Sequence, residues 1–263
     1  MGSLDRKPLK IIGAGKIVQA AFLNNQLPDD CEIYDIMDSR KSFLVKNINS
    51  FRQSNSITIL CASVQEAELL KTSDKVNSRL VVAKANLSLV QDLLMKGVFD
   101  TGLVLVVTNP SELIAEFIYR NSLNKNVYAL GLGVDKKRYD EILRSKSESE
   151  GTDVVVSTMA GNHYDFPYPI LKGCDSARKT EKLIKMLKQD LKIKIAQEFN
   201  GYNPPVESGV FTLLQALKSV YDRGQLLVSG YCDELHCFSG GILEEEFFAP
   251  SLGDSYSEKQ AIR

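Results

Sequence analysis

Short, continuous apolar runs alternate with amphipathic stretches throughout the first half of the chain. Three of these runs lie at residues 9–12, 56–63 and 103–107, and residues 76–95 and 110–120 carry apolar side chains at helical spacing. A strand that is apolar on both faces must be covered by helices on both faces, which is the arrangement of a parallel sheet. The first half therefore predicts an α/β fold with one parallel sheet.

The second half has a different pattern. Helices are expected at residues 135–144, 178–192 and 206–221, and strands at 153–159, 225–232 and 235–248, with turn chemistry at Gly240-Gly241. Strands that follow one another closely are antiparallel, so this half is expected to be α+β. We place the boundary so that residues 1–131 form the first domain and 132–263 the second.

Composition excludes several classes of partner. The formal net charge is -1 and Lys and Arg are spread along the chain, which argues against nucleic acid or an anionic membrane as a partner. No apolar run is long enough for a membrane span, which takes about 18 residues. The five scattered cysteines include no CxxC pair, so we expect a cytoplasmic protein with neither a disulfide framework nor a metal site.

A glycine loop follows the first apolar run. Gly13 permits a tight turn after the strand, and Gly15 lets the backbone approach a pyrophosphate. Lys16 and Ile17 then begin a helix whose N-terminus attracts phosphate groups. Val18 stands where such loops usually have a third glycine, and this weakens the signal. The loop alone is compatible with a dinucleotide-binding site and equally with a strand–turn–helix segment that binds no ligand.

Asp35 strengthens the dinucleotide interpretation. It ends the second expected strand at the distance from the loop where a carboxylate accepts hydrogen bonds from the adenosine ribose hydroxyls. A carboxylate at this position favours NAD over NADP, and the nearby Arg40 keeps NADP open. The alternative is a surface Asp at a strand end. With Asp35, the first domain is expected to be a Rossmann-type, NAD-binding domain.

Four further motifs occur in order. They are Asn77-Ser-Arg-Leu80, Val106-Val-Thr-Asn-Pro-Ser-Glu112, Leu130-Gly-Leu-Gly-Val-Asp-Lys-Lys-Arg-Tyr139 and Gly161-Asn-His-Tyr-Asp165. With the glycine loop, this sequence resembles the lactate/malate dehydrogenase family. The resemblance implies a Rossmann-type domain followed by a substrate domain. It also implies NAD-dependent interconversion of a 2-oxo acid and an L-2-hydroxy acid.

The resemblance assigns a role to three residues of the second domain. His163 matches the catalytic acid/base, which titrates near neutrality. Asp135 matches the carboxylate that orients this histidine. Arg138, one helical turn further on, matches the arginine that binds the substrate carboxylate as a planar fork. Each residue alone would most often be structural, and only their occurrence together in family order favours these roles.

Three more positions follow from the resemblance. Asn109 matches the asparagine near the substrate oxygen and the nicotinamide ribose, and the following Pro110 is cis in the family. Arg79 matches an arginine on a mobile loop that polarises the substrate carbonyl. Asn203 aligns with a substrate-pocket position, and Tyr164 replaces a glycine beside the catalytic histidine.

The chain also departs from the family. It is shorter than usual members of the family, it lacks a segment between Asp35 and Ser56, and it has no evident C-terminal helix. The resemblance therefore leaves open whether the chain forms a homodimer. The loop before Arg79 contains Lys71 and Lys75 but no further arginine, which favours a monocarboxylic substrate. Two alternatives stay open: a catalytically impaired protein that keeps the fold for binding or regulation, and a specialised biosynthetic ketoreductase with the same mechanism.

Overall fold

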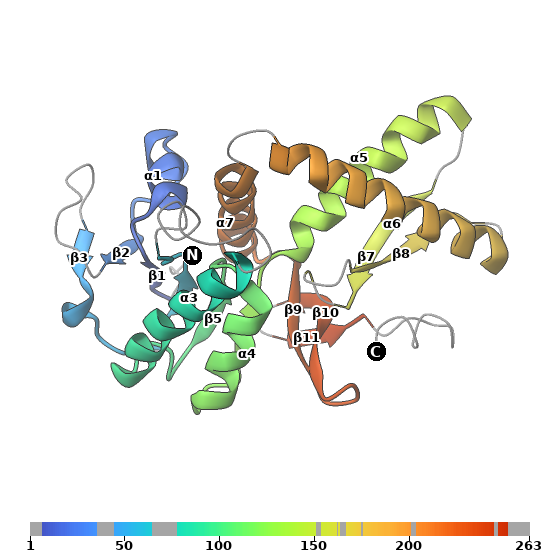
Figure 1. Cartoon of the computed structure of the whole chain (residues 1–263). Helices are drawn as coiled ribbons and strands as arrows, with labels where there is room; N and C mark the ends of the chain where they lie inside the picture. Colours follow the sequence, from blue (N-terminus) through green and yellow to red (C-terminus); the bar gives the residue numbers. More distant parts are fainter. Residues whose placement is uncertain are drawn as a thin grey trace, which may run out of the picture. The chain divides into compact units, whose positions relative to one another are not determined.

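The computed structural model describes residues 7–35, 45–64, 78–150, 154–161, 163, 167–174, 176–200, 204–244 and 247–251 (Figure 1). The chain divides into two compact units, residues 1–129 and 130–263. The sequence places a domain boundary after residue 131. Within the described ranges, no helix combines the length and the apolar character that crossing a membrane requires.

In its described residues, the first unit contains six parallel strands. They are β1 (Leu9–Ile12), β2 (Glu32–Asp35), β3 (Val45–Asn47), β4 (Ile57–Leu60), β5 (Leu103–Val106) and β6 (Val127–Ala129). Their order across the sheet is β3-β2-β1-β4-β5-β6, and each strand runs parallel to its neighbours. This is the strand order of the Rossmann fold, with its switch point between β1 and β4. The predicted parallel sheet is confirmed.

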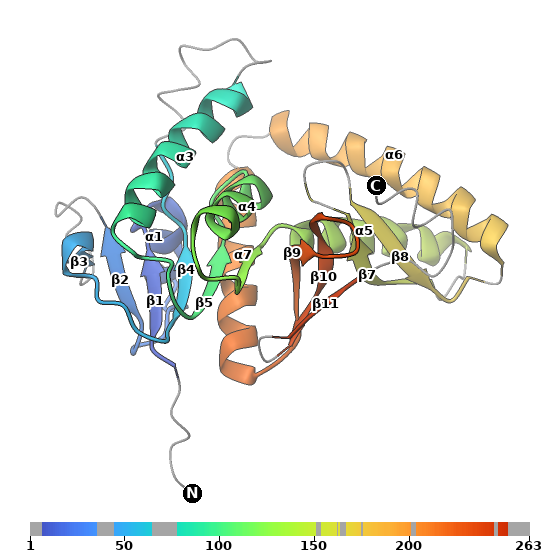
Figure 2. The same cartoon turned by 90° about the horizontal axis from the view of Figure 1, so that it is seen from below.

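Helices cover both faces of this sheet. α1 (Lys16–Leu23) follows β1, whereas α3 (Ser78–Met95) and α4 (Ser111–Asn121) follow β4 and β5, and a 3-10 turn occupies Ile48–Ser50. The strand order reverses at β1, so right-handed crossovers place α1 on one face and the other two helices on the opposite face. Figures 1 and 2 show this arrangement. Ile11, Ile59 and Leu105 are accordingly fully buried between the layers.

The second unit combines helices with antiparallel strands. Its elements are α5 (Leu132–Glu150), β7 (Val155–Ala160), β8 (Tyr168–Lys172), α6 (Ala177–Asn200), α7 (Pro204–Asp222), β9 (Leu226–Cys232), β10 (Cys237–Glu244) and β11 (Phe247–Pro250). β7 pairs with β8, and β9, β10 and β11 form a meander, all antiparallel. The expected α+β organisation of this half is confirmed.

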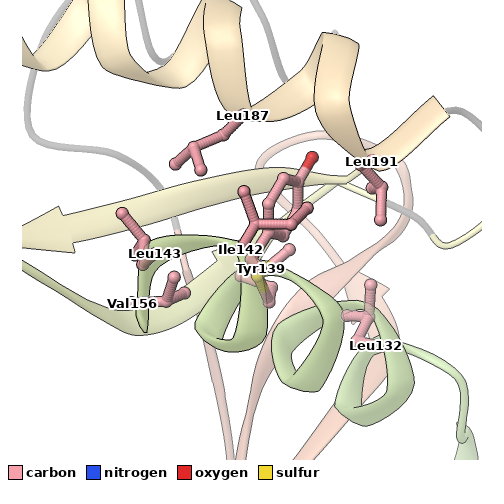
Figure 3. Close-up of a cluster of buried hydrophobic side chains, with 8 residues drawn as sticks. Leu132, Tyr139, Ile142, Leu143, Val156, Leu187 and Leu191 are labelled. Carbon is pink, nitrogen blue, oxygen red and sulfur yellow. The ribbon is translucent and has the colours of Figure 1, made fainter. Parts of the chain in front are cut away.

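An apolar core joins α5, α6 and β7 (Figure 3). α5 contributes one buried stripe, α6 packs across it with leucines one helical turn apart, and β7 lies against both. The buried residues are Leu132, Tyr139, Ile142, Leu143, Val156, Met159, Leu187 and Leu191. Because Tyr139 and Leu132 anchor the first turns of α5, this core fixes the helix end that carries the predicted site residues.

The predicted turn at Gly240-Gly241 is wrong. Both glycines lie inside β10, and the chain reverses at residues 233–236 instead. A Cβ on Gly240 would lie 2.5 Å from the carbonyl oxygen of Met159, and Gly240 N donates to the carbonyl of Gly161 at 2.6 Å. Glycine is present here because the backbone of β7 passes so close, which is a common reason for glycine inside a strand.

Candidate active site

The buried carboxylate of Asp135 binds two other polar side chains of the second unit. Asp135 lies in the first turn of α5, where the helix dipole stabilises a negative charge, and its side chain is 2% exposed. Its Oδ1 accepts a hydrogen bond from Arg138 Nη1 at 3.1 Å, and its Oδ2 accepts one from His163 Nδ1. One carboxylate therefore fixes both a cation and an imidazole.

His163 is held with a defined ring orientation. An ionised carboxylate can only accept hydrogen bonds, so Nδ1 must carry the proton shared with Asp135. This leaves Nε2 as the nitrogen that can exchange a proton with another molecule. The histidine side chain is only partly buried, so the ring is accessible on one side. Such a histidine can act as a general acid and base.

The imidazole ring lies directly over Gly131. A Cβ added to this glycine would come within 3.0 Å of His163 Cγ and 3.2 Å of Cδ2. Gly131 therefore limits where the ring can lie, in addition to the bond from Asp135. The sequence did not single out this residue, although it lies in the 130–139 motif that carries the family resemblance.

The backbone before His163 is also fixed. Gly161 turns the chain with a φ of 78°, and its carbonyl accepts the 2.6 Å hydrogen bond from Gly240 on β10. Tyr139 lies one helical turn after Asp135, and its hydroxyl donates to the carbonyl of Pro167 at 3.2 Å. Burial, and then the charge of Asp135, raises the pKa of Tyr139 far above its usual value. The phenol thus stays neutral beside the carboxylate.

Arg138 lies on the same face of α5 as Asp135. The two are three residues apart, which is the spacing at which helical side chains meet, and Arg138 is 9% exposed. A guanidinium carries five N–H donors in a rigid fork that matches a carboxylate. Through Asp135 the structure thus brings together His163 and Arg138, and these are three of the four residues that the sequence predicted for this unit, the fourth being Asn203.

The glycine loop of the first unit has the geometry of a dinucleotide site. Gly13 has a φ of 102°, and a Cβ there would overlap the backbone of Ala62 after β4. Gly15 is the N-cap of α1, and no side chain caps that helix. The loop therefore lies at the switch point between β1 and β4, with backbone N–H groups at a helix N-terminus, where phosphate groups bind. These residues fit the cofactor that the sequence predicts.

Asp35 contacts this loop. It ends β2, and its Oδ2 accepts a hydrogen bond from Ala14 N at 2.7 Å. Lys16 and Ile17 occupy the first turn of α1, and Lys16 is exposed. Val18, in place of the third glycine, is fully buried in the packing of α1. The substitution that weakens the sequence motif is thus accommodated between helix and sheet.

Asn109 follows β5, and its peptide bond with Pro110 is cis. Its carbonyl accepts a 2.7 Å hydrogen bond from the side chain of Asn86, a fully buried residue of α3. Asn86 Oδ1 in turn accepts from Val64 N at 2.8 Å. Asn86 therefore ties together the loops that follow β4 and β5. Asn86 is not among the residues predicted from the sequence, although a polar residue among the apolar positions of a helix was the available signal.

Several predicted positions lie wholly or partly outside the described residues. Arg79 falls in the first turn of α3, but its side chain is outside the description. Asn203 and Tyr164 lie outside it entirely, as do Arg40 and the two lysines of the loop before Arg79, Lys71 and Lys75. Residues 36–44 and 252–263, where the chain departs from the family, are also outside.

Comparison with known proteins gives structural matches only. No family model matches the sequence, and no curated protein matches it. Malate dehydrogenase from Plasmodium falciparum has a TM-score of 0.68 at 15% identity, over 97% of this chain and 94% of that chain. Malate dehydrogenase from Archaeoglobus fulgidus in complex with NADH has a TM-score of 0.68 at 16% identity, over 97% and 94%.

Lactate dehydrogenase from Cryptosporidium parvum, complexed with lactic acid and its nicotinamide cofactor, has a TM-score of 0.64 at 16% identity, over 99% of this chain and 94% of that chain. The matches cover both units in each case, so they extend well beyond the Rossmann-type sheet. The fold that the sequence resemblance predicts is confirmed: this chain has the fold of the malate and lactate dehydrogenases.

Proposed function

We propose that this chain is an NAD-dependent oxidoreductase of the lactate/malate dehydrogenase family. It interconverts a 2-oxo acid and an L-2-hydroxy acid. The observation that carries the proposal is the single buried carboxylate of Asp135, which binds His163 with one oxygen and Arg138 with the other. A proton donor and a carboxylate-binding cation are thereby held by one rigid group on one helix.

Four residues divide the chemistry of 2-oxo acid reduction: His163, Asp135, Arg138 and Arg79. NADH, when bound, supplies the hydride. His163 gives the proton from Nε2 to the carbonyl oxygen and takes it back in the reverse direction. Asp135 stabilises the imidazolium and sets its tautomer. Arg138 binds the substrate carboxylate, and Arg79, through its side chain, polarises the carbonyl.

The cofactor is assigned to the first unit. The backbone of Gly13 and Gly15 and the first helical residues, Lys16 and Ile17, bind the pyrophosphate. Asp35 accepts hydrogen bonds from the ribose hydroxyls, which favours NAD over NADP. Asn109 binds the nicotinamide ribose. Residues 1–131 are thus the NAD-binding domain.

The remaining assignments concern the substrate side. Residues 132–263 form the catalytic domain, and Asn203 contributes to the substrate pocket.

All five cysteines are thiols, which fits a reducing compartment, and we place the protein in the cytoplasm. A homodimer is proposed as the assembly.

A panel of 2-oxo acids scored by NADH oxidation tests the proposal. Pyruvate, oxaloacetate and branched or aromatic 2-oxo acids are offered to the full chain, with turnover expected on at least one. His163→Asn should lower turnover by about 10²- to 10⁴-fold and leave NADH affinity unchanged. His236→Asn is the matched control, because His236 lies in the turn after β9 with a φ of 52°, which asparagine tolerates.

Two outcomes would replace this proposal. NADH binding without turnover on any 2-oxo acid would indicate a dehydrogenase fold kept for binding or regulation, an alternative that the replacement of the third loop glycine by Val18 favours. Turnover confined to a different carbonyl compound would indicate a specialised biosynthetic ketoreductase. Absence of binding at millimolar NADH or NADPH would exclude both enzymatic functions, the 2-hydroxy acid dehydrogenase and the ketoreductase.

A further inference from the structure

Strands β9 and β10 (Figure 1) form a hairpin, and the register pairs two cysteines at its end. Cys232 is the last residue of β9, Cys237 is the first of β10, and the two are directly opposite in the antiparallel register. The four-residue turn between them includes a hydrogen bond from Leu235 N to the carbonyl of Cys232 at 3.3 Å. Both side chains are thiols.

This register places the two residues within disulfide reach. Directly opposite residues of antiparallel strands have Cα atoms about 4.5 or 5.5 Å apart, depending on whether the pair is hydrogen-bonded. A disulfide takes Cα separations of about 4.4–6.8 Å. Both kinds of pair therefore meet the Cα criterion, and the closer kind also brings the Cβ atoms to about 4.5 Å, the upper end of the separation that a disulfide takes.

The exposure of the two thiols differs in a way that suits stepwise oxidation. Cys237 is half-buried, whereas Cys232 is 3% exposed. A bulky oxidant can therefore reach Cys237, and the neighbouring Cys232 is shielded from it. This is the arrangement of an attacking cysteine beside a resolving cysteine.

Two of the other cysteines are poorly suited to such chemistry. Burial raises the pKa of Cys61 to about 12, and burial together with Asp30 raises the pKa of Cys31 to about 11. The thiolate is the reactive form, so both are kept inert. A metal site is a weaker interpretation of Cys232, His236 and Cys237, because the described residues include no group of three His, Cys, Asp or Glu placed to hold an ion.

We propose that Cys232 and Cys237 form a reversible thiol–disulfide redox site whose reaction partner is a low-molecular-weight disulfide such as oxidised glutathione. The Cys237 thiolate attacks the oxidant, forms a mixed disulfide and releases one glutathione thiolate. The Cys232 thiolate then attacks Cys237 Sγ, which closes the intrachain bond and releases the second glutathione. Two electrons pass to the oxidant, and the two cysteine protons end on its thiols.

The test equilibrates the full, folded chain in glutathione buffers of graded ratio, quenches with acid, then unfolds the chain in denaturant, alkylates the remaining thiols and measures intact mass. At oxidising ratios we expect a species lighter by two hydrogen atoms, with Cys232 and Cys237 linked on peptide mapping and three cysteines alkylated. Reduced buffer should restore five alkylated cysteines. The site is independent of the proposed function, since this readout involves neither NADH nor turnover.

Single variants separate the two roles. Cys232→Ser should stop at a stable glutathione adduct on Cys237, and Cys237→Ser should stay largely unmodified because Cys232 is buried. Cys174→Ser, at a half-buried cysteine outside the hairpin, should leave the disulfide unchanged. The proposal is overturned if the wild-type chain keeps both thiols or accumulates only mixed disulfides, if other cysteines are linked, or if the bond forms only in urea.

Discussion

The absence of a side chain at Gly131 has a measurable consequence for His163. Gly131 has no positive φ that would exclude alanine, and the nearest obstacle to a Cβ among the described residues is the imidazole of His163, 3.0 Å away. Gly131→Ala should push the ring off its position and reduce kcat by up to about 10²-fold, the effect of a displacement near 1 Å. Its KM for NADH should not change, because the cofactor residues belong to the other unit.

Gly224→Ala is the matched control, because a Cβ there has no heavy atom within 4 Å. Steady-state kinetics of both variants, with the pH dependence of kcat, would distinguish a displaced acid from general destabilisation. If Gly131→Ala has wild-type kcat and an unchanged pH profile, Gly131 does not position His163.

At this scale the sequence predicted residues whose chemistry is specific and missed those defined by contact. Asp135, Arg138 and His163 were found because a carboxylate, a guanidinium and an imidazole occur in a recognisable order. Gly131 lies in the same motif, but its neighbour His163 comes 32 residues later, and only coordinates show the two in contact. Gly240 was assigned to a turn because Gly-Gly usually marks one, and its real neighbour, Met159, lies on a distant strand.

At the scale of elements, Asn86 is the residue through which α3 fixes two loops. Asn86→Ala would leave Val64 N and the carbonyl of Asn109 without this side chain as partner. Val64 is partly exposed and Asn109 is exposed, so water can replace the lost partner at both groups, and each lost hydrogen bond should lower the free energy of unfolding by about 0.5–1.5 kcal/mol. Urea denaturation measures the change. Asn121→Ala, at an exposed asparagine at the end of α4, should stay within about 0.5 kcal/mol of wild type.

Glu32 on β2 and Lys46 on β3, the two outer strands of the parallel sheet, form a contact whose strength depends on pH. Hydrogen bonds from Lys46 on β3 and then from Tyr34 on β2 lower the pKa of Glu32. A lowered pKa in the folded state stabilises the protein above the unfolded value of about 4.3, and this contribution is lost as the pH falls through the folded value. Glu32→Gln should therefore be less stable at pH 7, and the difference should vanish under acid.

The effect should be below about 1 kcal/mol, because the Lys46 and Glu32 side chains are 41% and 36% exposed and water screens them. Thermal unfolding of both proteins between pH 3 and pH 7 provides the comparison. A gap between wild type and variant that stays constant down to pH 3 would mean that the hydrogen bonds do not act on the ionised form.

The sequence predicted the elements that have a strong hydrophobic pattern and missed those whose pattern is weak. The buried strand β5 is a continuous apolar run, and β1 and β4 are apolar runs interrupted by one residue each, Lys10 and Thr58, so the sequence shows all three strands directly. β3 has three half-buried residues and no alternation, so it gives no signal. β8 contains Pro169, which normally argues against a strand, but it is tolerated here because β8 pairs with β7 alone.

At the scale of the whole molecule, the residues assigned to cofactor and to substrate belong to different units. Gly13, Gly15, Asp35 and Asn109 lie within residues 1–129, and Asp135, Arg138 and His163 lie within 130–263. If the proposed roles are correct, substitutions in the first unit should weaken NADH binding and substitutions in the second should weaken 2-oxo acid binding. Both binding steps can be measured separately, so this division is testable.

Gly13→Ala and Arg138→Lys form the decisive pair. Alanine at position 13 would be strained at a φ of 102° and would overlap the backbone of Ala62. NADH at about 100 times its Kd should stabilise the wild-type fold by about 2.7 kcal/mol, seen as a higher Tm, and Gly13→Ala should lose most of this shift. Arg138→Lys should keep the shift in full, because lysine preserves a positive charge beside Asp135.

The same Arg138→Lys variant should raise the KM for the 2-oxo acid about 10- to 100-fold, since a charged hydrogen bond contributes about 1.5–3 kcal/mol and lysine cannot bind a carboxylate as a fork. Thermal shift with NADH and steady-state kinetics with the 2-oxo acid give the two readouts on the same preparations. Equal loss of both ligands in Arg138→Lys would contradict the anchor role, because it would mean that Arg138 supports the fold as a whole rather than the substrate carboxylate.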